Sequence, residues 1–196
     1  MRQTSANFEQ YIRSFEQLQD LEIEKITASS SLLQLRRHQL LLREGDICRH
    51  KIFVLKGLLR MYRVRADGTE STMRFAAENN WIIDHESYMS QQSSHYRIEA
   101  LEDSKVLIWT RETMEELFEA MPVFRSFSDR LREKSMNDSV QRIYMNLSYT
   151  AEEKYEDFMK THPEIFRRIP LHLVATYLGV SRETLSRIRH KQHRNK

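Results

Sequence analysis

Seven short apolar segments between residues 31 and 110 constrain the fold of this chain more than any other feature of its sequence. Each is rich in Leu, Ile, Val or Tyr and has the length of a short strand. Three of the four glycines lie in turns between them, because glycine accepts a positive φ without a Cβ clash. Many short strands joined by tight turns predict an antiparallel barrel or jelly roll. The segments are Leu32–Arg36, Gln39–Arg43, Lys51–Lys56, Leu58–Arg65, Thr69–Phe75, Tyr96–Leu101 and Lys105–Thr110, and the turns are Glu44-Gly45-Asp46, Lys56-Gly57 and Asp67-Gly68.

Helical periodicity flanks this region on both sides, so the predicted fold class is α+β. Two short helices are expected within residues 7–28, broken near Gln19–Asp20. Helices are also expected from Arg111 to Leu147, where Pro122 is placed to begin a long one. We interpret this long helix as a dimerisation helix between two domains, and packing on its own barrel is the alternative. The apolar positions are Met114, Leu117, Phe118, Met121, Phe124, Phe127, Leu131, Met136, Val140, Ile143 and Leu147.

Charge is distributed unevenly, although the whole chain carries a net charge of only +3. Residues 167–196 hold eight Lys or Arg and one acid, a net charge of +7, and residues 1–166 have a net charge of −4. A basic end on an acidic body indicates contact with a polyanion, with a solvated basic tail as the alternative.

Rare residues exclude several classes of protein. The single cysteine, Cys48, excludes an internal disulfide framework and a cysteine-rich zinc or iron–sulfur site. No apolar run approaches the roughly 20 residues of a membrane span, and the first twenty residues do not read as a signal peptide. We therefore expect a soluble cytoplasmic protein without a membrane partner. Cys48 follows a turn, and a structural cysteine is favoured over a reactive thiol.

The sequence after residue 150 is expected to form a small helical domain. Residues 150–161 predict a helix that Thr150 and Glu153 begin with a capping box. Residues 170–190, PLHLVATYLGVSRETLSRIRH, predict a helix-turn-helix. Pro170 opens its first helix, and Gly179 ends that helix in the left-handed conformation. The other positions are Leu171, Val174, Ala175 and Leu178 on the apolar face of the first helix, Val180 between the helices, Ser181 as N-cap of the second, and Leu185 and Ile188 as its buried residues.

The exposed face of the second helix is the strongest functional signal in the sequence. Arginine offers a bidentate fork to guanine O6 and N7, and glutamate accepts a hydrogen bond from cytosine N4. The start of a recognition helix lies against base edges, and basic residues that follow it suit phosphate contacts. The alternative is an ordinary helical hairpin with a solvated basic face. The predicted DNA-binding residues are Ser181, Arg182, Glu183, Thr184, Ser186, Arg187, Arg189, His190 and Lys191, and His193, Arg194 and Lys196 are further candidates for phosphate contacts.

These motifs resemble the Crp–Fnr superfamily of bacterial transcription regulators over nearly the whole chain. The segments Glu44-Gly45-Asp46, Phe53–Gly57, Leu59–Tyr62 and Asp67–Glu70 are similar to its cyclic-nucleotide-binding-type β-roll, and Val180–Arg187 is similar to its recognition helix. The resemblance implies a homodimer that binds double-stranded DNA, base contacts by Arg182, Glu183 and Arg187, and RNA polymerase as a further partner. It divides the chain into a sensor (1–121), a dimerisation helix (122–147) and a DNA-binding domain (148–196).

Residues 168–172 and the short C-terminus look closest to Bacteroidetes-type members, in which the β-wing after the recognition helix is reduced or absent.

The expected effector pocket departs from the family pattern. Nucleotide-binding members carry Gly-Glu and Arg-Ser pairs around the cyclic phosphate. Here residues 80–86 contain no glycine, and residues 92–97 place serine or histidine where that arginine and serine would lie. We therefore expect no cofactor, and an effector other than cyclic AMP or none. The candidate pocket residues are Asp84, Glu86, Ser93, Ser94, His95 and Arg97.

Two other functions are compatible with parts of the sequence. One is a sensor or protein-interaction module that does not bind a specific DNA sequence. The other is a metal-dependent enzyme of the cupin kind, using ligands from the set His38, His50, His85, His95 and Glu86. The barrel region contains no close His-x-His pair, which disfavours the enzyme.

Overall fold

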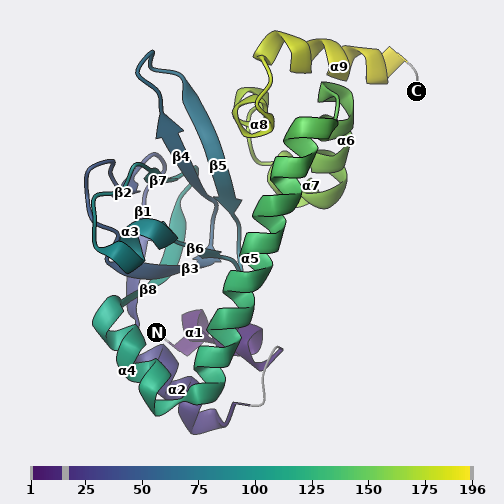
Figure 1. Ribbon diagram of the computed structural model, residues 1–196. Coiled ribbons are helices and arrows are strands. Elements are labelled where there is room, and N and C mark those ends of the chain that lie inside the picture. The colour runs from purple at the N-terminus through teal and green to yellow at the C-terminus, as the bar shows by residue number, and fades with distance from the viewer. Residues whose placement is uncertain (1, 15–17, 195–196) are drawn as a thin grey trace. The chain divides into compact units, whose positions relative to one another are not determined.

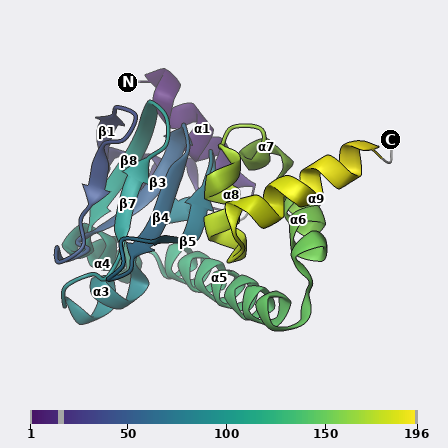
Figure 2. The same ribbon diagram turned by 90° about the horizontal axis from the view of Figure 1, so that it is seen from above.

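The computed structural model describes residues 2–14 and 18–194 (Figures 1 and 2). The chain forms two compact units, and each is built from two separate stretches of sequence. The first unit comprises Met1–Met61 and Phe75–Glu133, and the second comprises Tyr62–Arg74 and Lys134–Lys196.

Two four-stranded sheets form a β-roll (Figure 1). Strand order is β1-β8-β3-β6 in one sheet and β2-β7-β4-β5 in the other. The pairs β1/β8, β3/β8, β3/β6 and β2/β7 are antiparallel. The strands are β1 (Ser31–Leu35), β2 (Leu40–Leu42), β3 (His50–Lys56), β4 (Leu59–Val64), β5 (Glu70–Ala76), β6 (Trp81–Ile82), β7 (Arg97–Ala100) and β8 (Ser104–Thr110).

The central strand β3 separates two apolar cores, because successive side chains of a strand point to opposite faces. Ile52 and Val54 belong to a core to which both sheets contribute, so the interior of the β-roll is filled by apolar side chains. Phe53 and Leu55 belong to the second core, on the other side of β3.

Helices of the first unit cover the second core. They are α1 (Arg2–Arg13), α2 (Asp20–Ala28), α4 (Arg111–Ala120) and the first turns of α5 (Pro122–Ser148). The indole Nε1 of Trp109 donates to the carbonyl oxygen of Ile26 at 2.8 Å and so ties β8 to α2. Thr110 begins α4 by accepting a hydrogen bond from the backbone N–H of Thr113.

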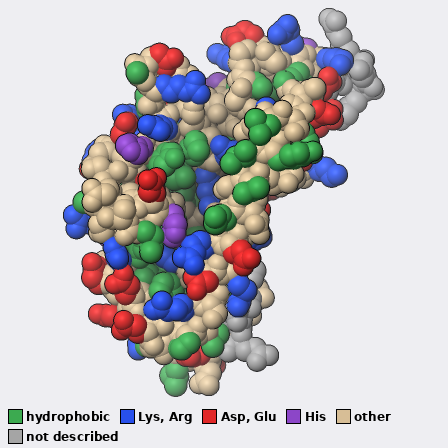
Figure 3. Space-filling view, viewed as in Figure 1, with side chains coloured by type: hydrophobic (Ala, Val, Ile, Leu, Met, Phe, Trp, Pro, Cys, Tyr) green, Lys and Arg blue, Asp and Glu red, His purple; other side chains and the backbone are tan. Residues whose placement is uncertain are grey.

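Helix α5 is apolar on one side in its first half and on roughly the opposite side in its second half, since each helical residue turns by about 100°. Phe124 and Phe127 are buried in the second core, and Leu131 packs against it. Five apolar residues of the second half are 55–83% exposed. Hydrophobic side chains gather on the surface along this part of α5 (Figure 3). We call the five residues the apolar seam, and they are Met136, Val140, Ile143, Tyr144 and Leu147.

The second unit contains four further helices, which are α6 (Ala151–Thr161), α7 (Pro163–Phe166), α8 (Leu171–Leu178) and α9 (Arg182–Arg194). Helix α6 packs against α7, α8 and α9. Its capping box is formed as predicted, because the Thr150 hydroxyl accepts from the N–H of Glu153 and the Glu153 carboxylate accepts from the N–H of Thr150. In residues 151–194, the buried side chains with described burial are Tyr155, Phe158, Ile165, Ile169, Leu173, Val174, Ala175, Leu178 and Leu185.

The predicted fold class is confirmed. Each of the seven predicted strand segments overlaps one observed strand, whose ends lie within one residue of the predicted ends. The two N-terminal helices and the long helix from Pro122 are confirmed as well. The alternative interpretation holds for the first half of the long helix, which packs on the chain's own core. Its second half is exposed, and its role in dimerisation stays a prediction.

Three short elements were not predicted from the sequence, namely β6, α7 and the six-residue helix α3 (His85–Ser90). Pro170 also precedes α8 as its N-cap rather than lying in its first turn. None of the described helices is both long enough and apolar enough to span a membrane.

Candidate nucleic-acid interface

A glycine turn joins α8 to α9 (Figure 2). Gly179 has φ +68° and ends α8 in the left-handed conformation, with its N–H donating to the Ala175 carbonyl. The N–H of Val180 donates to the same carbonyl at 3.1 Å. This pair of bonds closes the helix end and turns the chain sharply, as the sequence predicts.

The second helix begins at the predicted N-cap. The hydroxyl of Ser181 accepts from the backbone N–H of Thr184 at 3.1 Å, which satisfies one of the free donors of the first turn. Leu185 is fully buried and Ile188 is half-buried. These two side chains fix which side of α9 faces its own unit.

The remaining surface of α9 carries the predicted DNA-binding residues. Ser181, Arg182, Glu183, Arg187, Arg189, His190 and Lys191 are exposed, and Thr184 and Ser186 are half-buried. The side chains of His193, Arg194 and Lys196 lie outside the described residues. The surface of the first turns therefore offers arginine and glutamate side chains together at the start of a helix.

Two members of this set are engaged within the protein. The pKa of Glu183 is lowered by the backbone N–H at the start of α9 and by the Ser181 hydroxyl, so its carboxylate is an ionised acceptor. Lys191 forms an exposed ion pair with Glu152 at 3.0 Å. A phosphate contact by Lys191 therefore requires that it leave Glu152, at small cost because exposed pairs contribute about 0–1 kcal/mol.

The six candidate effector residues do not converge on one site. Asp84 and Ser94 are buried and meet, with the Ser94 hydroxyl donating to the Asp84 carboxyl at 2.6 Å. Asp84 also accepts from the backbone N–H of Ser87 as N-cap of α3. Glu86, Ser93 and His95 are exposed.

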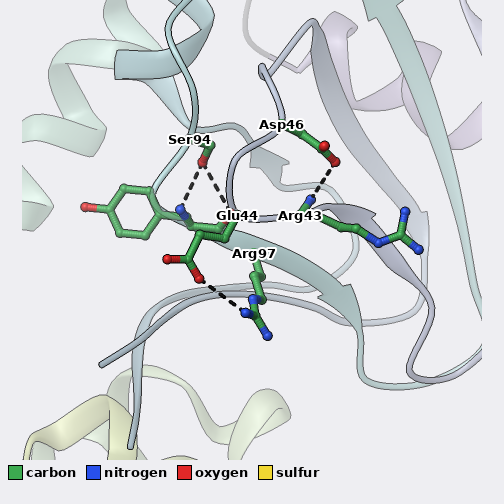
Figure 4. A network of polar contacts seen from close by, with 6 residues as sticks. Arg43, Glu44, Asp46, Ser94 and Arg97 are labelled. Atoms are coloured by element: carbon green, nitrogen blue, oxygen red, sulfur yellow. Dashed lines mark hydrogen bonds and ion pairs between the residues drawn. The ribbon is translucent and has the colours of Figure 1, made fainter. Parts of the chain in front are cut away.

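Arg97 is directed to a neighbouring loop instead (Figure 4). Its guanidinium pairs with Glu44 at 3.2 Å. The backbone of the loop around Gly45 is also bonded to the segment just before β7. The N–H of Gly45 donates to the Ser94 carbonyl and the N–H of Ser94 donates to the Asp46 carbonyl, each at 2.8 Å. Asp84 is a buried hydrogen-bond acceptor, whereas a cyclic phosphate needs donors. The expectation that cyclic AMP is not the effector stays a prediction.

Three cationic residues that the sequence analysis did not single out make defined contacts. Lys51 donates to the Ser128 hydroxyl at 2.7 Å, and burial lowers the pKa of its amine to about 8. Arg74 and Arg142 contact elements of the second unit. A lysine at the start of an otherwise apolar strand was the available signal for Lys51, whereas the two arginines gave none in the sequence.

The alternative of a metal enzyme gains no support from the geometry. Among the described residues, no three His, Cys, Asp or Glu side chains lie close enough to hold a metal ion. Cys48 is buried, and burial raises the pKa of its thiol, which favours the structural interpretation of that residue.

Comparison with known proteins assigns the N-terminal part of the chain. Residues 32–121 match the family described as the cyclic nucleotide-binding domain. The match covers all eight strands apart from the first residue of β1, and it ends just before α5. No curated protein matches this chain in sequence.

Solved structures extend the likeness beyond the cyclic nucleotide-binding domain. FixK2 from Bradyrhizobium japonicum has a TM-score of 0.71 at 19% identity, covering 85% of each chain. The c-di-GMP responsive global regulator CLP of Xanthomonas campestris has a TM-score of 0.72 at 14% identity, covering 90% of this chain and 93% of its own. A crp/fnr-family regulator from Eubacterium rectale has a TM-score of 0.68 at 18% identity, covering 90% and 85%. The chain therefore has the Crp–Fnr fold, and the likeness to Bacteroidetes-type members stays a prediction.

Proposed function

We propose that this protein is a homodimeric transcription regulator that binds a near-palindromic DNA site. The observation that carries the proposal is the reading face of α9, where a Ser181-capped helix start presents Arg182, Glu183 and Arg187 to solvent. Such a helix suits the major groove, with the arginines available to guanine and the glutamate to cytosine. The regulators of the same fold support this assignment.

The apolar seam supports a dimer. Met136, Val140, Ile143 and Leu147 are spaced by four, three and four residues, the spacing with which two helices pack along a shared line. An exposed apolar stripe of this length on one helix is unfavourable in water, so a second copy of the chain is the natural cover. In the dimer, two α9 helices would enter successive major grooves about 34 Å apart.

The proposed division of labour follows the prediction from the sequence, with a sensor in 1–121, a dimerisation helix in 122–147 and DNA binding in 148–196. The protein would act in the cytoplasm, and RNA polymerase remains the proposed further partner. The sensor would regulate DNA binding through an effector that prefers one of two states of the dimer, and cyclic AMP is not proposed for that role.

Selection of bound duplexes from a random DNA library tests the function. The expected motif is a near-palindrome, and the selected duplex should compete about 10³-fold or more better than random DNA. Equal competition by all sequences at every salt concentration would refute the proposal and leave the interaction module as the function.

Two variants distinguish base-specific contacts from contacts with the phosphate backbone. Arg187→Ala is expected to cost about 1–3 kcal/mol and to relax specificity at one base position. Lys191→Ala is expected to weaken all sequences about equally and to reduce the salt dependence by about one phosphate contact. Full sequence preference in Arg187→Ala would contradict the assignment of the reading face.

A further inference from the structure

Residues 62–74 form the outer part of the β4–β5 hairpin, and they belong to the same compact unit as the C-terminal helices. One polar contact inside this unit joins the hairpin to α8. The hydroxyls of Thr72 and Thr176 lie 2.7 Å apart, and Thr72 is only 1% exposed. A directional bond between two hydroxyls fixes the position of α8 more closely than apolar packing alone does.

Arg142, on α5, reinforces this contact from the side. Its guanidinium donates to the backbone carbonyls of Thr72 and Met73. The same guanidinium lies over the ring of Tyr177, 4.6 Å from its centroid, in the geometry of a cation–π contact. One planar side chain thus touches strand β5 and the last turn of α8 at once. We call Arg142, Thr72, Thr176 and Tyr177 the Arg142 clamp.

A second arginine holds the same hairpin to α5. Arg74 donates to the hydroxyl of Ser135 at 2.8 Å, and burial lowers the pKa of its guanidinium. Ser135 and Arg142 are seven residues apart and therefore lie on one side of α5. That side is roughly opposite the apolar seam, so the clamp leaves the seam free for a second copy.

The position of the clamp in the sequence connects it with DNA reading. Thr176 and Tyr177 precede Gly179 by three and two residues, and Gly179 sets the direction of α9. A movement of the last turn of α8 is therefore carried directly into the reading face.

We propose that Arg142 is a positioning residue, which holds the last turn of α8 against the β4–β5 hairpin and so fixes the orientation of the recognition helix. This inference rests on the proposed function, because orientation matters only if α9 reads DNA. Two recognition helices held in fixed orientations can bind both half-sites of a palindrome at once. When they are loosely held, the effective concentration of the second helix at its half-site is lower. Binding to one isolated half-site does not depend on that orientation.

The test compares full-length Arg142→Met with the wild type on two duplexes, the selected palindrome and one half-site, by fluorescence anisotropy. The variant is expected to bind the palindrome about tenfold more weakly and the half-site unchanged. Lys134→Met is the matched control, since it removes one exposed positive charge from the same helix and should leave both affinities unchanged. Arg142→Lys keeps the charge but not the planar fork, so it should restore only part of the loss.

Other outcomes overturn the proposal. Equal losses on both duplexes would show that Arg142 only supports folding, and tighter binding to the palindrome would show that the clamp opposes DNA binding. A variant indistinguishable from the wild type would show that the clamp has no role in reading.

Hydrogen exchange keeps the clamp testable even if the wild type does not discriminate between DNA sequences. Arg142→Met should raise amide exchange in residues 62–74 and in α8, while exchange in α2 of the other unit stays unchanged. The combination of faster exchange and a wild type without a preferred duplex would refute the function and retain the clamp. Unchanged exchange in both segments would refute the clamp itself.

Discussion

Replacing Gly57 with alanine is expected to destabilise the first unit strongly. Gly57 has φ +107°, and a Cβ added to it would lie 2.1 Å from Oγ, 2.6 Å from Cβ and 2.7 Å from Cα of Ser104. The left-handed backbone costs an L residue about 1–2 kcal/mol. The steric conflict adds about 1–3 kcal/mol, as overpacking of a filled site usually does. The expected loss in the free energy of unfolding is therefore about 2–5 kcal/mol.

Tryptophan fluorescence in a urea titration measures this loss selectively. The chain has two tryptophans. Trp109 lies in the second core of the first unit, and Trp81 packs against that core. Gly45→Ala is the matched control, since Gly45 also has a positive φ of +91° but has no atom within 4 Å of an added Cβ. It should lose only the backbone part, about 1–2 kcal/mol.

The steric part of the reasoning has its own check. Ser104→Gly in the Gly57→Ala background removes the two nearest atoms and leaves the Cα conflict, so part of the stability should return. If Gly57→Ala and Gly45→Ala lose the same free energy of unfolding, the close approach of Ser104 is not a determinant of stability.

Three further perturbations follow from the contacts described above. The pKa of Lys51 falls from 10.5 to about 8 on folding, so between these pH values the unfolded chain binds more protons and this group's contribution to stability rises with pH. Thermal melts should therefore show that the Tm difference between the wild type and Lys51→Met changes between about pH 8 and pH 10.5. A constant Tm difference would contradict this reasoning. Thr150→Ala should lower the free energy of unfolding by about 1 kcal/mol, because it removes the cap of α6. Circular dichroism in a urea titration would measure this loss, and a midpoint equal to that of the wild type would contradict it. Val140→Glu should convert a dimer into monomers in sedimentation velocity, whereas a persistent dimer would move the interface away from the apolar seam.

The β-roll was predictable because its signals are local. Turn glycines and short apolar segments lie next to one another in the sequence, and the strand boundaries follow from them. The two-residue strand β6 was not predictable, since two residues are too few to show the alternation of a strand. Helix α3 was missed for a related reason, because its six residues make fewer than two turns and show little helical periodicity.

The candidate site was predictable in one part only. The reading face of α9 follows from helical periodicity and from the cap at Ser181, both of which are properties of adjacent residues. The Arg142 clamp joins residues about 70 positions apart, and nothing in the composition around Arg142 distinguishes it from a solvated arginine. Partners of this kind are fixed by the fold rather than by local pattern.

Because the apolar side of α5 changes along its length, the number of residues between its two halves determines the direction in which the second half faces. Phe127 and Leu131 face the chain's own core, and Met136 and Val140 face away from it. One residue inserted between Leu131 and Met136 would turn everything that follows by about 100°, whereas a seven-residue insertion would restore the direction to within about 20°. A hybrid that joins this sensor to another regulator's reading head must therefore preserve the helical phase at the junction, and matching domain boundaries alone is not sufficient.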